Sequence, residues 1–585
     1  MAFIGKKIET SCDNFGDLIR ENCLIVDKTM FIKEFLLDQK ISLITRPRRF
    51  GKTINMSMLQ HFFSKTVTNI ATNGMFKNLL IAKEENGEFI KKHQGQYPVI
   101  FLSFKDLKEP NLQSTISQLR NLIQTLYREH QDILRSDNLN LSEKTIFHEY
   151  LSGSISDEKL QLSLAFLSEF LYKAYNKKTI ILIDEYDTPL SHAHQYKFLD
   201  PLSDFMRNVF SSALKGNQFL EKGLMTGILR VSKNNMLSGL NNLKVYTVLD
   251  AKYAEYFGFI EEEVNELMQM IGINDLHEVQ GVKKFYNGYN IGNTIIYNPW
   301  SLMHYLDSRE LIPYWVLTAN DGLLKEIFLQ SDDETRTLLG DLMQGKMITG
   351  KVNLHIRYED LLQDPDAIWT LLLFCGYLTV EDKFWDAAWV CQLKIPNKEI
   401  LEQYTSIFKN WFERKLGRNY TSFLTNLAKG NVEEFTYSLS NYLMESLSFH
   451  DITKKSEKFY HGFVAGLIAS IRDTHFVDSN KESGRGRYDI MLIPKNKEQK
   501  SIIIEFKKVE NLDALPAAAQ LALKQINTQL YSTALKKFPY IESVLKIGLA
   551  FCEKAVMSVY QTENLSTKSN TAIVKGEIIQ REDEW

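Results

Sequence analysis

The chain has 585 residues, too many for a single hydrophobic core, and this length predicts roughly three to four domains. Hydrophobic residues make up 44% and charged residues 24% of the sequence, as in an ordinary folded, soluble protein. The net charge of -3 excludes a global basic field that would draw the protein to nucleic acid or to a membrane. Any contact with a polyanion must therefore be local.

The cysteines and the apolar segments predict a cytoplasmic protein. No apolar run follows the lysines of the N-terminal MAFIGKKIET, and the most apolar later segment, AIWTLLLFCGYLTV, is shorter than the ~20 residues that span a bilayer. We expect that segment to be a buried helix or strand, and we expect no contact with a membrane. The five cysteines have spacings that fit neither a zinc site nor a disulfide framework, which favours a reducing compartment: Cys12, Cys23, Cys375, Cys391 and Cys552.

Residues 1–309 are expected to form an α/β domain. Short β-branched runs such as ISLIT and TIILIDEY alternate with amphipathic stretches such as SLAFLSEFLYKAY. This alternation is typical of a parallel sheet covered by helices.

A phosphate-binding loop is predicted in RPRRFGKT, which follows the strand ISLIT directly in the segment SLITRPRRFGKT. In such a loop the backbone N–H groups and the helix N-terminus at Gly51 surround the phosphates, Lys52 reaches the outer phosphates, and Thr53 holds magnesium. Arg46 stands where these loops normally have their first glycine. The alternative is a basic turn that ends in a glycine.

The segment TIILIDEYD supplies a second half for a nucleotide site. Four apolar residues precede Asp184 and Glu185, which places both carboxylates at the end of a buried strand. Asp184 can hold magnesium through water, and Glu185 can polarise an attacking water. The alternative is a buried strand that ends in a solvated acidic turn. Two motifs in this order, each at a strand end, favour a nucleoside triphosphate site.

Four segments together resemble a known family: RPRRFGKT, ILIDEYDTPL, LSGLNNLKVYT and FYNGYNIGNTIIYNPWSL. They are similar to the AAA-ATPase-like domain of bacterial proteins that also carry a C-terminal PD-(D/E)XK nuclease-superfamily domain. The resemblance covers nearly the whole chain, and the family usually has arginine at the position of Arg46. It implies a P-loop NTPase-like fold and the binding of ATP and Mg²⁺ at Gly51, Lys52, Thr53 and Asp184.

Arginines beside the loop extend the expected nucleotide contacts. The guanidinium groups of Arg46, Arg48 and Arg49 can replace missing backbone donors or sense the γ-phosphate, and Phe50 is included with them. The alternative is a solvated loop, which suits Arg48 better than Arg46. Arg230, after a further strand, is expected either to contact the nucleotide as a sensor or to be a surface arginine.

Two further segments of the family pattern have mainly structural interpretations. Asp-Lys-Thr in IVDKT is expected to cap the helix TMFIKEFLL, with a place beside the nucleotide as the alternative. The pair Asn287-Gly288 predicts a tight turn, and Asn298-Pro299 predicts a helix start with proline at its first position. The aromatic residues around them are expected in the core.

The remainder of the chain is expected to form a mainly helical connector, residues 310–445, and a restriction-endonuclease-like α/β domain, residues 446–585. In the C-terminal domain Asp489 begins one predicted strand, while Glu505 and Lys507 share a face of the next. Two carboxylates on magnesium beside a lysine can bind a scissile phosphate and activate water. This arrangement resembles the PD-(D/E)XK motif, with Tyr488 in place of its proline. The alternative is a pair of solvated strand edges.

Residues around this motif complete the expected nuclease site. Glu457 on a preceding helix is expected as a further metal ligand, and Arg485 and Arg487 as phosphate contacts. A helix is predicted from about Leu515 to Leu535, on which Gln525 matches the family's motif glutamine. The helix is expected to carry a polar face (Gln520, Lys524, Asn527, Tyr531) and an apolar stripe (Leu523, Ile526, Leu530).

The resulting hypothesis is an ATP-binding domain, expected also to hydrolyse ATP, that controls a magnesium-dependent nuclease acting on DNA or RNA. One alternative is an ATP-dependent switch whose nuclease-like domain only binds nucleic acid or protein. Another is a remodeller of protein partners that uses the aromatic segments YNGYN and YNPW as contact surfaces. The sequence does not determine the oligomeric state or the nucleic acid.

Overall fold

The structure is a computed structural model, and its contacts divide the chain into two compact units. Unit 1 comprises residues 1–319 and 349–400, and unit 2 comprises residues 320–348 and 401–585. The segment 310–445 therefore contributes residues to both units. The structure describes residues 3–5, 7–229, 240, 242–315, 327, 333–354, 364–416, 419–446, 460, 464, 467–468, 471, 474–479, 482–483, 486–497, 499–567 and 569–579.

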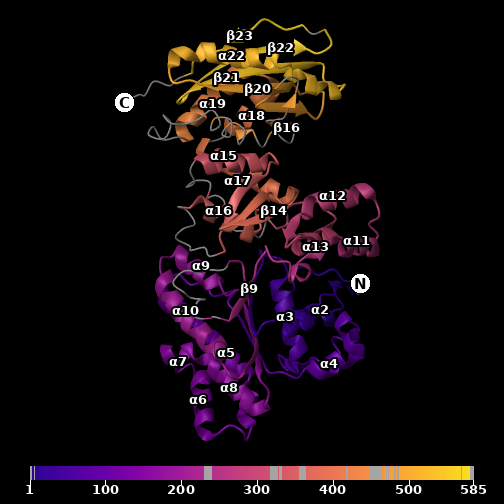
Figure 1. Ribbon diagram of the computed structural model, residues 1–585, viewed down its shortest axis with the longest axis vertical. Coiled ribbons are helices and arrows are strands. Elements are labelled where there is room, and N and C mark those ends of the chain that lie inside the picture. Colours follow the sequence, from indigo (N-terminus) through magenta and orange to yellow (C-terminus); the bar gives the residue numbers. More distant parts are fainter. Residues whose placement is uncertain are drawn as a thin grey trace. The chain divides into compact units, whose positions relative to one another are not determined.

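The centre of unit 1 is a parallel five-stranded sheet, as the alternating pattern predicts. Figure 1 shows helices α5, α8 and α10 on one side of this sheet and α2, α3 and α4 on the other. The strands, in spatial order, are β6 (Val99–Ser103), β7 (Thr179–Asp184), β8 (Leu220–Gly227), β3 (Ile41–Thr45) and β9 (Leu243–Tyr246). The helices are α2 (Met30–Leu37), α3 (Lys52–Phe63), α4 (Glu88–His93), α5 (Leu112–Glu129), α8 (Ser163–Tyr175) and α10 (Leu199–Leu214).

Hydrophobic burial holds the sheet and its helices together. The apolar run of β7 is fully buried, and each such side chain contributes about 1.5–3 kcal/mol when it leaves water. α5 buries Ile116, Leu119 and Ile123 at spacings of three and four, so one face packs and the other is solvated.

Parallel strands end at the same edge of the sheet. The loop after β3 and the carboxylates after β7 therefore lie at one edge, with only β8 between the two strands.

A second part of unit 1 follows the parallel sheet. A small antiparallel sheet in the order β10-β12-β11 packs with three helices around a core of its own. Tyr286, Tyr289 and Tyr297 are at most 3% exposed, so their burial gives no support to the interpretation of these aromatics as a contact surface. The elements are β10 (Phe259–Ile260), α11 (Glu261–Met270), α12 (Leu276–Tyr286), β11 (Tyr289–Ile291), β12 (Thr294–Tyr297) and α13 (Pro299–Ser308).

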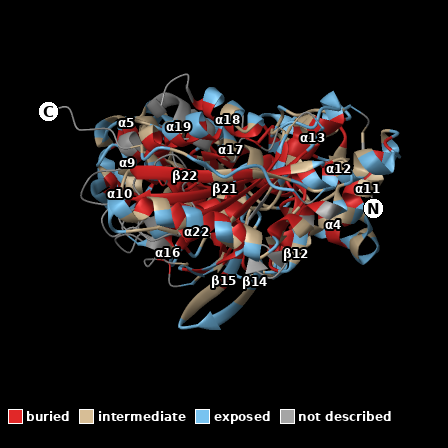
Figure 2. Ribbon diagram, turned by 90° about the horizontal axis from the view of Figure 1, so that it is seen from above, coloured by how far each residue is buried: buried red, intermediate tan, exposed pale blue. Residues whose placement is uncertain are grey.

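The apolar segment 367–380 is both a helix and a strand. Asp364 caps α16 (Pro365–Cys375), which has proline at its first position and ends at Gly376 in the left-handed region, with φ of +88°. β14 (Thr379–Asp386) then pairs with β15 (Ala388–Lys394) in a sheet of order β13-β15-β14 that includes β13 (Ile348–Val352). The outer part of the β14–β15 hairpin is exposed (Figure 2). The middle of the chain thus contains a sheet as well as helices.

Unit 2 is built on a six-stranded mixed sheet in the order β16-β19-β20-β21-β22-β23. β20 and β21 run parallel, and both strands are almost wholly buried. β19 pairs antiparallel with β20, as the predicted hairpin requires. The strands are β16 (His475–Ser479), β19 (Ile490–Pro494), β20 (Ser501–Lys508), β21 (Ser543–Cys552), β22 (Ala555–Asn564) and β23 (Val574–Lys575). Helices α18 (Asn419–Lys429) and α19 (Val432–Ser446) also belong to this unit.

The predicted helix 515–535 is shorter than expected. α22 (Leu515–Thr528) ends because Leu530 adopts the left-handed region, with φ of +57°, and a 3-10 helix, η9 (Tyr531–Lys537), follows. Leu523 and Ile526 are buried as expected, whereas Leu530 is 48% exposed and Tyr531 is buried. The assignments of Leu530 to the apolar stripe and of Tyr531 to the polar face were therefore wrong.

No helix among the described ranges combines the length and apolarity that crossing a bilayer requires.

Candidate functional sites

The loop between β3 and α3 has the backbone geometry of a tight strand-to-helix turn. Gly51, the residue before α3, has φ of +75° and ψ of 18°, a conformation that favours glycine. The ammonium group of Lys52 donates to the carbonyl of Arg46 at 3.1 Å and to that of Pro47 at 2.9 Å. Burial lowers the pKa of Lys52, because a cation is costly away from water. An anion in the turn would supply a better acceptor for this ammonium group than two neutral carbonyls.

Thr53 and Asp184 meet at the edge of the sheet. The Thr53 hydroxyl donates to Asp184 Oδ2 at 2.8 Å, and the Thr226 hydroxyl of β8 donates to Asp184 Oδ1. Asp184 is fully buried, and burial raises the pKa of its carboxyl group. A hydroxyl and a carboxylate form an oxygen donor set that fits Mg²⁺, so Thr53 and Asp184 can hold this ion. The sequence motifs did not predict the part played by Thr226, because nothing in its local pattern marks it.

Two further carboxylates lie in the turn after β7. The backbone of Glu185 has the left-handed φ of +52°, with which the chain turns away from β7. Its carboxylate accepts a hydrogen bond from the Thr188 hydroxyl at 3.2 Å. Asp187 accepts from the backbone N–H groups of Ile228 and Leu229 at 2.8 and 2.9 Å, and burial raises its pKa. Asp187 thus anchors the chain just before Arg230. Sequence reasoning missed it, although it stands two residues after Glu185 in the same motif.

Arg46 lies in the interior of unit 1. Its side chain is fully buried, and burial lowers its pKa to about 10. Nη1 donates to the carbonyls of Thr45 at 2.8 Å and Thr247 at 2.9 Å, and Nη2 donates to that of Lys252 at 3.4 Å. These acceptors join the end of β3 to the chain that follows β9. The geometry therefore gives no support to the expected contact between Arg46 and a phosphate.

The remaining residues of the loop lie in different surroundings. Arg48 and Arg49 are exposed, and the Arg49 guanidinium stacks 3.9 Å above the ring of Trp300. Phe50 is buried and meets the ring edge of Tyr289, with centroids 4.8 Å apart. Among Arg46, Arg48, Arg49 and Phe50, which the structure describes, Arg48 and Arg49 are the two that reach solvent. The predicted sensor Arg230 lies outside the described residues.

The IVDKT segment is structural, but the expected cap is not made. Thr29 stands before α2 without a side-chain capping bond; instead Asp27 accepts from both the backbone N–H and the hydroxyl of Thr29. Lys28 forms an ion pair with Glu263 at 2.5 Å. Of the other two expectations, the helix start is confirmed, because Asn298 caps α13 by accepting from the backbone N–H of Trp300 and Pro299 follows it. The expected tight turn at Asn287-Gly288 is wrong, because these residues connect α12 to β11 without a turn, and the turn of the β11–β12 hairpin lies at Gly292 and Asn293.

In unit 2, Asp489, Glu505, Lys507 and Gln525 form a group that we call the carboxylate cluster. The backbone N–H of Phe506 donates to Asp489 Oδ2 at 2.8 Å, and that of Asp489 donates to Glu505 Oε2 at 3.4 Å. Lys507 Nζ lies 3.8 Å from Glu505 Oε1. The antiparallel register of β19 and β20, which pairs Ile490 with Ile504, brings Asp489 next to Glu505. The structure thus joins the three residues that the sequence pattern singles out.

Gln525 connects this cluster to the core of unit 2. Its amide group donates to Glu505 Oε1 and to the Tyr531 hydroxyl, the latter at 3.3 Å. Tyr531 in turn packs edge-to-face on Tyr488, with ring centroids 5.9 Å apart. Burial raises the pKa of Tyr531, so it remains a neutral hydroxyl at physiological pH. Tyr488, in the proline position of the motif, is therefore a core residue that supports Tyr531.

The donor atoms of the cluster fit magnesium. Among the described residues, no group of three or more His, Cys, Asp or Glu side chains gathers to hold a metal. Mg²⁺ commonly takes only one or two carboxylates and completes its octahedron with water and substrate oxygens, so Asp489 and Glu505 suffice. The expected further ligand Glu457 and the expected phosphate contact Arg485 lie outside the described residues, as does the side chain of Arg487.

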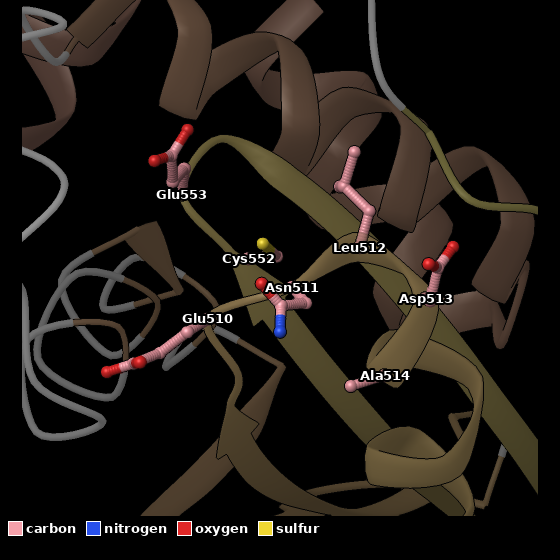
Figure 3. A pocket seen from close by; sticks show the side chains of 7 residues that line it. All are labelled: Glu510, Asn511, Leu512, Asp513, Ala514, Cys552 and Glu553. Atoms are coloured by element: carbon pink, nitrogen blue, oxygen red, sulfur yellow. The ribbon is translucent and has the colours of Figure 1, made fainter.

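A surface pocket of about 770 Å³ lies elsewhere in unit 2 and contains no member of the carboxylate cluster. Figure 3 shows its wall, formed by the loop from Glu510 to Ala514 and the turn at Cys552 and Glu553. Glu510, Asp513 and Glu553 give this wall a negative charge, which disfavours a phosphate backbone. The pocket is therefore not a candidate for nucleic-acid binding.

Comparisons with known proteins match both regions. Residues 9–237 match a family model described as a predicted AAA-ATPase, and residues 455–561 match that of the PD-(D/E)XK nuclease superfamily. The chain is also similar to a protein of Azotobacter chroococcum mcd 1 described as an uncharacterised protein in the vnfD 5′ region. The two are 23% identical over 380 residues, which span 64% of each chain and so less than two thirds of that relative.

Proposed function

Because the chain carries an AAA-ATPase-like domain and a PD-(D/E)XK nuclease superfamily domain, we propose that it is an ATP-controlled, magnesium-dependent nuclease. The observation that carries the nuclease assignment is the meeting of Asp489, Glu505 and Lys507 at one end of the β19–β20 pair. The proposed reaction is the hydrolysis of a phosphodiester bond in DNA or RNA.

In the proposed nuclease site each residue has a distinct part. Asp489 and Glu505 would hold Mg²⁺, and the bound ion would supply a water of lowered pKa and a positive charge beside the scissile phosphate. Lys507 lies beside them and stabilises the negative charge that develops on the phosphate. The water oxygen bonds to phosphorus, one ester P–O bond breaks, and the water proton ends on the leaving oxygen. Gln525 keeps Glu505 in position through its amide hydrogen bond.

In the proposed nucleotide site the turn after β3 receives the phosphates of ATP. Lys52, which now donates to two carbonyls, would donate to the outer phosphates, Thr53 and Asp184 would hold Mg²⁺, and Glu185 would orient the attacking water. Arg48 and Arg49 are the exposed cations of the loop beside this turn, whereas Arg46 supports the loop from within. Nucleic acid is the proposed partner of the nuclease domain.

The experiment that tests this function incubates the purified full chain with DNA and with RNA, with Mg²⁺ or Mn²⁺, and with or without ATP. Metal-dependent cleavage is expected, and Asp489→Asn should abolish it while preserving the shape of the side chain. An exposed carboxyl group of the same unit, Asp513, gives the matched control Asp513→Asn. Cleavage by Asp489→Asn at the wild-type rate would rule out this site, whereas nucleic-acid binding without any cleavage would favour a binding-only domain.

A further inference from the structure

Each residue from Arg46 to Phe50 contacts a part of unit 1 that lies outside the matched AAA-ATPase region. Pro47 lies against Gly376, where a Cβ atom would come within 2.9 Å of the proline ring. The Trp315 indole N–H donates to the carbonyl of Arg48 at 3.2 Å, Arg49 stacks on Trp300, and Phe50 meets Tyr289. A phosphate loop normally needs glycines, which give its backbone freedom. Here the loop carries large side chains instead, and those of Arg46, Pro47, Arg49 and Phe50 contact other segments, whereas Arg48 is held through its backbone carbonyl.

These partners also hold the start of α17 (Lys398–Leu416). Glu399, in the first turn of this helix, is fully buried, and its Oε1 accepts from the backbone N–H of Trp315 and from the Ser301 hydroxyl, both at 2.8 Å. Trp315 therefore contacts the phosphate loop with its ring and α17 with its backbone. The carboxylate is well placed, since a helix N-terminus favours negative charge.

A second contact connects the same two places. Gly288, next to Tyr289, packs so closely on the chain before α17 that a Cβ atom would lie 2.1 Å from the carbonyl oxygen of Pro396. Only glycine fits this approach, since its φ of +108° also disfavours other residues. Asn397 then caps α17 by accepting from the backbone N–H of Ile400 at 3.1 Å. The Asn-Gly motif therefore places the loop partner Tyr289 beside the start of this helix.

Nucleotide binding changes the hydrogen bonds of the loop at the point where these contacts begin. Lys52 now donates to the carbonyls of Arg46 and Pro47, which directly precede the Arg48 carbonyl held by Trp315. When phosphate takes the ammonium group, these carbonyls lose their donor and the backbone of the loop must readjust. α17 starts within unit 1, and from Leu401 onward its residues belong to unit 2.

We propose that Trp315 and Glu399 act as a positioning pair that transmits the nucleotide state of the phosphate loop to the first turn of α17. This inference rests on the proposed ATP binding, and it assigns a physical route to the control of the nuclease domain. It also assigns a role to Arg49 and Phe50 of RPRRF, which attach the loop to Trp300 and Tyr289, the neighbours in sequence of Ser301 and Gly288.

The test measures hydrogen–deuterium exchange of the backbone amides in the first turns of α17, with and without saturating ATP and Mg²⁺. ATP binding is measured on the same samples. In the wild type, ATP should change the exchange of these amides. Trp315→Phe removes the indole donor but keeps an aromatic ring for the edge-to-face contact with Tyr377, and it should lose that ATP-dependent change while still binding ATP. Trp385→Phe, at an exposed site of β14, is the matched control and should behave as the wild type.

A second pair of variants tests the carboxylate. Glu399→Ala should lose the ATP-dependent change, whereas Glu399→Gln retains an oxygen acceptor and should keep it. Thermal melting of each variant identifies any that fails to fold. An α17 that exchanges alike with and without bound ATP in the wild type would overturn this inference and leave the proposed function intact. Absence of ATP binding by the wild type would overturn both.

Discussion

The hydroxyl of Thr53 donates to the carboxylate of Asp184 at 2.8 Å, although 131 residues separate them in the chain. The two residues follow different strands, β3 and β7, with β8 between them. These two oxygen groups are the ones that would hold Mg²⁺ in the proposed nucleotide site.

Lys52→Ala should weaken ATP binding, because the ammonium group supplies a charge-assisted hydrogen bond to phosphate. A loss of about 2 kcal/mol, on the order of 30-fold in Kd, is expected. Titration calorimetry measures this affinity, and circular dichroism should show a folded variant. Lys92→Ala, at an exposed position of α4, is the control. Unchanged ATP affinity in Lys52→Ala would remove the nucleotide site from this loop.

Asp184→Asn should change the pH dependence of stability in the absence of nucleotide and metal. Burial raises the pKa of Asp184 in the folded protein above its unfolded value of about 3.9, so the folded state binds more protons between these two values. The contribution of Asp184 to the free energy of unfolding of the wild type therefore falls as the pH rises from about 4 to above the raised pKa of the folded state.

Asparagine does not titrate, so the free energy of unfolding of Asp184→Asn minus that of the wild type should become more positive across this window and then level off. Urea denaturation of both proteins at a series of pH values measures this difference. A difference that stays constant or falls as pH rises would contradict the assigned burial of the charge.

Glu185→Gln should preserve ATP binding and slow hydrolysis. The carboxylate orients water and does not contact the phosphates in the proposed site, so Kd should change little while turnover falls by about 100-fold or more. Single-turnover phosphate release gives the rate, and a fluorescent ATP analogue gives the affinity. Equal loss of both would instead make Glu185 structural, through its turn with φ of +52°.

Gln525→Leu should lower the apparent Mg²⁺ affinity of nucleic-acid cleavage by about tenfold, since Glu505 loses the amide that orients it. Excess Mg²⁺ should restore most of the rate, because Asp489, Glu505 and Lys507 remain. A magnesium titration of the cleavage rate measures both effects, with Gln520→Leu on the exposed face of α22 as the control. A loss of rate that magnesium cannot restore would place Gln525 in the chemical step instead.

Arg46→Lys should destabilise unit 1 by about 1.5–3 kcal/mol, even though it conserves the charge. Lysine cannot reproduce the planar set of donors that reaches the carbonyls of Thr45, Thr247 and Lys252, and unpaired buried carbonyls are costly. Arg48→Lys, two residues away and exposed, should stay within about 0.5 kcal/mol of the wild type. Chemical denaturation compares them, and equal stabilities would show that Arg46 has no such structural role.

The sequence by itself determined the elements whose signals are local. The apolar run before Asp184, the Gly-Lys-Thr turn, the Asn-Pro helix start and the strand spacing of Glu505 and Lys507 each depend on neighbours in the chain. The structure has all of them. Such patterns are reliable because backbone conformation and side-chain alternation are set within a few residues. The same is true of the parallel sheet, which follows from alternating strands and helices.

Only the tertiary structure decided which way long side chains point and what they meet. Arg46 looked like a phosphate ligand because it is a cation in a phosphate loop, yet its acceptors are the neighbouring Thr45 carbonyl and carbonyls about 200 residues away in sequence. Tyr531 looked like part of a helix face until the left-handed Leu530 ended α22 and turned it toward Gln525. Trp315 and Glu399 carry no motif at all. Their roles come from hydrogen bonds between distant segments, whose geometry packing determines and local sequence does not record.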